Sequence, residues 1–128
     1  LRLDGSLVGQ TSGKVDNETH YSQSLTDAVA AAKPYSMISI HNHGTNLPPS
    51  GADFGSAGYH QYAFGIVACN DGNVYYYSTQ NARPFATNII DNIVDTKIKP
   101  PYNMGEIDAR EFALNQVAHD YGIEWRKL

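Results

Sequence analysis

A short apolar run that leads into a proline-rich segment most strongly limits what this chain can fold into. Residues 37–40 (Met-Ile-Ser-Ile) are typical of a β-strand, and the segment 41–50, with its adjacent prolines, predicts a loop. Ser50 is a favoured helix N-cap residue and predicts a helix from Gly51 to about His60. The chain is therefore expected to contain a strand-loop-helix junction, at which the end of a strand meets the first turn of a helix.

The remaining pattern alternates helix and strand periodicities. Polar, Gly-rich residues 1–17 predict an irregular strand or hairpin. Beyond it, the sequence predicts helices over 22–33, 87–98 and 105–121, strands over 64–69 and 74–78 around an Asn-Asp-Gly-Asn turn, and a closing strand near 123–125. We therefore expect an α+β fold with a mixed β-sheet flanked by helices, and a single domain over residues 1–128.

Composition excludes several classes of protein. The length of 128 residues, with 41% hydrophobic and 17% charged residues, is that of one globular core. A single cysteine, Cys69, excludes an internal disulfide and a multi-thiolate zinc cluster, and its apolar surroundings predict a buried thiol. The net charge of −4 argues against nucleic acid, and no apolar stretch predicts a membrane partner. Because the chain starts at Leu1, we expect a processed chain or an N-terminally truncated fragment of a longer protein.

The chemistry concentrates in a pair of histidines and a later aspartate. His41 and His43 are two residues apart, so on a strand they point to the same side, and Asp53 falls in the first turn of the next helix. Two imidazoles and a carboxylate leave one position of a tetrahedral Zn²⁺ open, as in catalytic zinc sites. His-x-His also arises by chance, and Ser50-x-x-Asp53 alone fits a helix capping box. The capping box is compatible with the metal site, because it would hold the Ser50 and Asp53 side chains at the rim of that site.

The combined string resembles the JAMM (JAB/MPN) metalloprotease motif, a His-x-His followed by Ser-x-x-Asp. It is similar to the RadC family in its His-Asn-His, its helix-strand-motif-helix order and its later Asp-Gly hairpin. In its local sequence it is closest to the JAB-like domains at the C-termini of phage head-morphogenesis proteins and of some bacterial polymorphic toxins, in which Ile-His-Asn-His, Pro-Pro-Ser and a later Gly-Ile-Val recur. The resemblance covers about residues 20–78. It implies a JAB/MPN-like sheet of the cytidine-deaminase-like kind.

The resemblance also implies roles for individual residues. His41, His43 and Asp53 would bind Zn²⁺, and Ser50 would stabilise the oxyanion of the tetrahedral intermediate. The family's general base is a glutamate well upstream of the histidines, and only Glu18 occupies such a position here. The implied function is a zinc metallopeptidase or isopeptidase with a protein or peptide substrate. The implied location is the cytoplasm of a bacterial host cell or the virion.

Alternatives stay open at this point. A non-catalytic JAB-like domain for assembly or peptide binding keeps the same residues without the base. A nuclease, suggested by the letters His-Asn-His, is disfavoured because such nucleases disperse those residues over a ββα unit. His60, two helical turns after Asp53, can approach the site, although a packed or solvent-facing side chain fits it better. Tyr75, Tyr76 and Tyr77 can line a peptide-binding edge or serve simply as strand residues.

Overall fold

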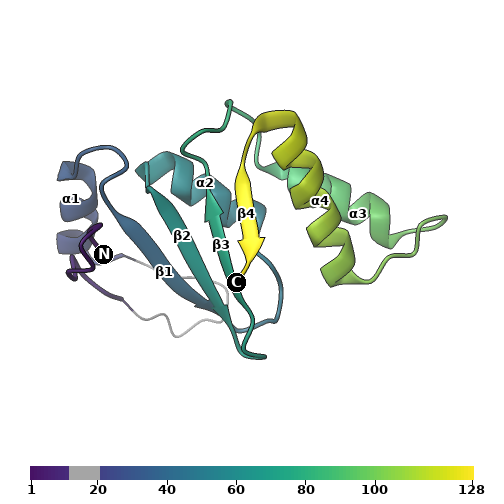
Figure 1. The fold of residues 1–128 in the computed structure, drawn as a ribbon, viewed down its shortest axis with the longest axis horizontal. Coiled ribbons are helices and arrows are strands. Elements are labelled where there is room, and N and C mark those ends of the chain that lie inside the picture. The colour runs from purple at the N-terminus through teal and green to yellow at the C-terminus, as the bar shows by residue number, and fades with distance from the viewer. Residues whose placement is uncertain (12–20) are drawn as a thin grey trace.

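The computed structural model describes residues 1–11 and 21–128 and has an α+β architecture. Its elements in chain order are α1 (Gln23–Ala31), β1 (Ile38–His43), α2 (Gly51–His60), β2 (Phe64–Cys69), β3 (Val74–Ser78), α3 (Asn88–Ile98), α4 (Glu106–Tyr121) and β4 (Glu124–Lys127). The predicted helices and strands after residue 21 are all present, with ends shifted by a few residues. Helices flank a four-stranded mixed sheet, as the sequence predicts (Figure 1).

The strands lie in the order β1-β2-β3-β4. β1 and β2 are parallel, whereas β2-β3 and β3-β4 are antiparallel pairs. The parallel pair requires a crossover, which α2 supplies, while the Asn70–Asn73 turn directly joins β2 to β3. Figure 1 shows α1 beside the β1 edge, and α3 and α4 side by side beyond β4. The β1-α2-β2 unit places the start of α2 at the carboxyl end of β1, where ligand sites of such units collect.

β1 is longer than the sequence predicts. The polar residues after Ile40 suggested a loop from His41 onward, but the strand continues to His43. Parallel pairing with β2 extends it, because His41 lies opposite Val67 and His43 opposite Cys69. Both histidines therefore stand on regular strand backbone, and the loop begins only after the second one.

One face of the sheet is covered by helices. Register places His41, Val67 and Tyr75 on this face, which packs against residues of α2, α3 and α4. The cluster of buried side chains includes Phe54, Val67, Tyr75, Tyr77, Ile90, Leu114 and Val117. The opposite face is more open, and Ile40 on it is 56% exposed. The metal-ligand candidates of β1 thus lie on the helix-covered face.

Local signals at the element ends explain the boundaries. The Ser22 side chain accepts a hydrogen bond from the Leu25 amide and begins α1. Gly122, in the left-handed conformation, ends α4. The described N-terminal residues form a turn at Gly5 and a single bridge from Arg2 to Met37, and residues 12–17 of the predicted irregular strand or hairpin lie outside the described residues. Among the described residues, no helix has the length and apolar character needed to cross a membrane.

Candidate metal centre

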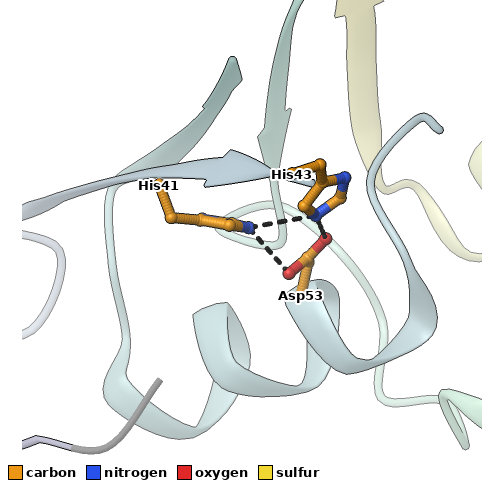
Figure 2. Close-up of side chains that lie close together, drawn as sticks. All are labelled: His41, His43 and Asp53. Atoms are coloured by element: carbon orange, nitrogen blue, oxygen red, sulfur yellow. Dashed lines mark hydrogen bonds and ion pairs between the residues drawn. The ribbon is translucent and has the colours of Figure 1, made fainter. Parts of the chain in front are cut away.

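His41, His43 and Asp53 converge at the carboxyl end of β1 (Figure 2). The Nε2 atoms of the histidines are 3.2 Å apart. His41 Nε2 lies 3.0 Å from Asp53 Oδ1, and His43 Nε2 lies 3.0 Å from Asp53 Oδ2. Ligand atoms around one tetrahedral zinc ion lie roughly 3.3 Å apart, given bonds of about 2.0 Å. The three side chains predicted from the sequence can therefore share one metal ion with little rearrangement.

A capping box fixes Asp53 at this site. The Asp53 amide donates to Ser50 Oγ at 3.2 Å, and the Ser50 amide donates to Asp53 Oδ2 at 2.8 Å. The capping interpretation and the metal-site interpretation of Ser50-x-x-Asp53 are thus both satisfied by one geometry. Because Oδ2 accepts the Ser50 amide, the Asp53 carboxylate is held facing the strand.

A backbone carbonyl orients His43. Its Nδ1 lies 2.9 Å from the Leu47 carbonyl oxygen, which can only accept, so Nδ1 carries the proton. The Nε2 of a neutral His43 then presents a lone pair to the Asp53 carboxylate at 3.0 Å. Two acceptors at that distance repel each other unless a cation lies between them. The site therefore demands either a second proton on His43 or a metal ion, and this demand is the physical argument that the residues fit a metal.

The pKa values of the site show the same demand. Burial alone would lower the pKa of His43, but hydrogen bonds to Asp53 and to the Leu47 carbonyl outweigh it and raise the pKa. Burial alone would raise the pKa of Asp53, but hydrogen bonds from His41 and His43 hold it well below its ordinary value. Asp53 thus stays ionised, and its charge attracts whichever cation the histidines accept.

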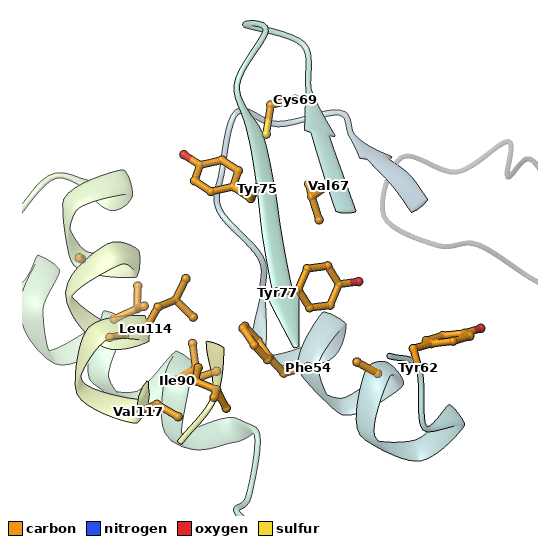
Figure 3. Packing of buried hydrophobic residues seen from close by; sticks show 14 of the residues in the cluster. Phe54, Tyr62, Val67, Cys69, Tyr75, Tyr77, Ile90, Leu114 and Val117 are labelled. Carbon is orange, nitrogen blue, oxygen red and sulfur yellow. The ribbon is translucent and has the colours of Figure 1, made fainter. Parts of the chain in front are cut away.

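Tyr77 forms the wall beside His41. Its ring meets the His41 ring edge-on at 6.2 Å and the Phe54 ring at 5.3 Å, and Figure 3 shows the Tyr77 and Phe54 rings close together. The ring leans over Gly65, where an added Cβ would lie only 2.2 Å from it. Tyr77 is 2% exposed, and burial, with the nearby Asp53 charge, raises the pKa of its hydroxyl. Sequence reasoning did not find this role, although a glycine inside a strand signals close packing.

The candidate base and the remaining histidines lie apart from the cluster or outside the described residues. Glu18, the candidate base, and His20 fall in residues 12–20, which the structure does not describe. His60 stacks on Tyr21 at 5.5 Å and is not among the converging ligands. His119 is exposed and lies against Asp120.

The tyrosines of β3 do not form a peptide-binding edge. β3 lies between β2 and β4, so it has no free edge. Tyr75 and Tyr77 are buried on the helix-covered face, and Tyr76 is half-buried on the opposite face.

Cys69 is buried, as the sequence predicts: the residue is 8% exposed, and burial raises the pKa of its thiol.

In the described part of the chain, the residues gathered here can bind a metal ion through two imidazoles and one carboxylate. This donor set provides nitrogen and oxygen ligands without thiolate, and a fourth position stays free for a water or a substrate. Comparison of the chain with protein-family models, with curated proteins and with solved structures finds no match. The geometry of the site and the sequence motif are therefore the basis for any functional conclusion.

Proposed function

We propose that this chain is a zinc-binding domain of JAMM type that hydrolyses peptide or isopeptide bonds. The observation that carries the proposal is the convergence of His41 Nε2, His43 Nε2 and the two carboxylate oxygens of Asp53, through contacts of 3.0–3.2 Å. Three protein ligands of this kind are typical of catalytic zinc, whereas structural zinc sites use four. The Leu47 carbonyl supports the assignment, because metal-binding histidines commonly donate their other N–H to a carbonyl or carboxylate.

The chain's own residues divide the work of hydrolysis. His41, His43 and Asp53 would hold the ion, and when bound, zinc supplies a water of lowered pKa and polarises the scissile carbonyl. Ser50 accepts the Asp53 amide through Oγ, so its hydroxyl proton is free to donate to the oxyanion of the transition state. Hydrolysis also requires a general base that takes the proton of the attacking water and then passes it to the leaving amine, and Glu18 is the candidate that the sequence offers.

The order of elements agrees with a JAB/MPN-like domain. α1 precedes β1, the His pair ends β1, the aspartate opens α2, and the β2-β3 hairpin follows. This order matches the arrangement that the motif implies over residues 20–78. We take the fold family as part of the proposal, with protein or peptide as the substrate class and with neither nucleic acid nor membrane as partner.

A non-catalytic metal-binding domain is the second candidate. Within the described ranges, Asp53 is the sole carboxylate of the cluster, and it serves as a ligand. A domain without a base would still bind zinc. Through the bound metal it would bind a carboxylate or carbonyl group of a partner peptide. The two candidates share the metal and differ in turnover.

Elemental analysis tests the metal site directly. The purified chain should carry about one zinc, as expected for one set of three protein ligands. His41→Ala and Asp53→Ala should lose it. His119→Ala is the matched control, because that side chain is 88% exposed and lies against Asp120, outside the group of converging ligands. Full zinc retention in both ligand variants would refute the site.

Turnover separates the two candidates. Zinc-treated wild type is incubated with a peptide library and with an isopeptide-linked ubiquitin-type substrate. The variants Asp53→Ala, Ser50→Ala and Glu18→Gln are assayed in the same way. Cleavage lost in Asp53→Ala and reduced at least about a hundredfold in Ser50→Ala supports the hydrolase. Zinc binding without cleavage of any substrate supports the non-catalytic domain. DNA nicking abolished by His43→Ala would favour a nuclease instead.

A further inference from the structure

The loop that follows β1 holds the carbonyl on which His43 depends. Residues 44–47 belong to no helix or strand. Yet the Leu47 carbonyl oxygen accepts from His43 Nδ1 at 2.9 Å and lies 3.5 Å from Cys69 Sγ, a thiol donor. A carbonyl can fix the tautomer of an imidazole only if the backbone that carries it is itself fixed. The position of this loop must therefore come from contacts made elsewhere.

Those contacts come from the β2-β3 turn. The Asn70 side-chain amide donates to the Gly44 carbonyl at 3.2 Å, and the Asp71 amide donates to Asn46 Oδ1 at 2.9 Å. Together with the Cys69 thiol, which lies against Leu47, these contacts join Gly44, Asn46 and Leu47 of the loop to the end of β2 and to the turn that follows it. Figure 3 shows Cys69 beside this turn, at the end of β2. Residues 44–47 are thus tied to a segment more than twenty positions later in the chain.

Hydrogen bonds within the turn itself allow it to serve as an anchor. Asp71 Oδ1 accepts the Asn73 amide at 2.9 Å, and Asp71 Oδ2 accepts the Asn73 side-chain amide at 2.9 Å. Gly72 takes a φ of +90°, which glycine adopts without strain, and its amide donates to the Cys69 carbonyl at 3.1 Å. Two regular strands continue from the turn on either side. Its geometry is therefore set independently of the metal site.

We infer that the β2-β3 turn positions the metal centre, and that Asn46 is the positioning residue through which it holds the Leu47 carbonyl against His43. The inference rests on the proposed zinc site. The chain of contacts runs from the Asp71 amide through Asn46 to the loop backbone, and from the Leu47 carbonyl to His43 Nδ1. Asn46 touches none of the ligands directly, so its effect on zinc acts only through the orientation of the ring.

Three variants isolate this path. Asn46→Ala removes the acceptor of the Asp71 amide, and Asn46→Asp keeps an oxygen at the same place. Thr45→Ala is the matched control, because Thr45 is exposed in the same loop and the hydrogen bonds that join this loop to the turn come from Gly44 and Asn46 instead. Zinc affinity is measured by competition with a chromophoric chelator. Long-range ¹H–¹⁵N correlation of the zinc-free chain, at a pH above the His43 pKa, reports which ring nitrogen carries the proton.

Asn46→Ala should weaken zinc binding about tenfold, at the low end for loss of an outer-shell partner. The His43 proton should then be distributed over both ring nitrogens, whereas wild type and Asn46→Asp keep it on Nδ1. Thr45→Ala should leave both readouts unchanged. Equal affinity and an unchanged tautomer in Asn46→Ala would overturn the inference, as would an equal loss of affinity in Thr45→Ala. A wild type that binds no zinc refutes the proposed function instead, and the tautomer measurement still tests the inference.

Discussion

At the scale of single residues, His43 and Asp53 carry opposite pKa shifts, which make the stability of the metal-free chain depend on pH. The pKa of His43 is raised above 6.5, so its contribution is fully present below about pH 6.5 and is lost as the pH rises through the raised pKa. The pKa of Asp53 is lowered below 3.8, so its contribution is present above about pH 3.8 and is lost as the pH falls further. Denaturant titrations in EDTA should give the largest free energy of unfolding between these values. His43→Ala should remove the decline on the alkaline side; an unchanged decline would contradict the pairing.

Gly65 tests the wall beside His41. A Cβ at this position would lie 2.2 Å from the Tyr77 ring, so Gly65→Ala must push the ring away from the sheet. We expect a loss of about 1–3 kcal/mol in the free energy of unfolding, as for overpacked cores. Gly44→Ala is the control, since a Cβ there meets nothing within 4 Å. Chemical denaturation of both variants decides the matter, and equal stability would show that Tyr77 moves without cost.

At the scale of elements, the N-cap of α2 joins helix stability to metal binding. Ser50→Ala should cost about 1 kcal/mol, the usual effect of losing a side-chain cap. Ser22→Ala should cost α1 a similar amount, because Ser22 accepts the Leu25 amide at 3.3 Å in the same way. Only Ser50→Ala should also weaken zinc binding, because the first turn of α2 carries Asp53. Thermal unfolding and zinc titration of both variants measure the two effects, and zinc affinity lost equally in Ser22→Ala would contradict this coupling.

Local sequence patterns predict the part of the site that α2 provides, but they miss part of what β1 provides. Ser50-x-x-Asp53 is a local pattern, so the capping box that places the carboxylate follows from four consecutive residues. The length of β1 depends on pairing with β2, which no local pattern contains, so the strand was expected to end before His41. The Leu47 carbonyl escaped prediction for a further reason: every residue has one, and only the fold selects which carbonyl meets His43.

His60 illustrates the limit of face arguments on a helix. Seven residues separate it from Asp53, so the two share a face of α2, as expected. Seven residues also span about 10 Å along the axis, which is too far to contribute to the same ion. The structure instead stacks His60 on Tyr21 and places the tilted Tyr62 ring 5.3 Å from it, and burial lowers the pKa of the imidazole. A shared face predicts a shared environment only for neighbouring turns.

At the scale of the whole molecule, zinc would connect elements that the fold merely brings near each other. The ligands come from β1 and from α2, so the unfolded chain lacks the assembled site and zinc binds the folded chain preferentially. Free zinc at a hundred times its dissociation constant should then add about 2.7 kcal/mol to the free energy of unfolding. For a domain of this size, the melting temperature should rise by roughly 10 °C. Scanning calorimetry with zinc and with EDTA measures the difference. His41→Ala should abolish the rise and His119→Ala should keep it; an undiminished rise in His41→Ala would place the bound zinc elsewhere on the protein.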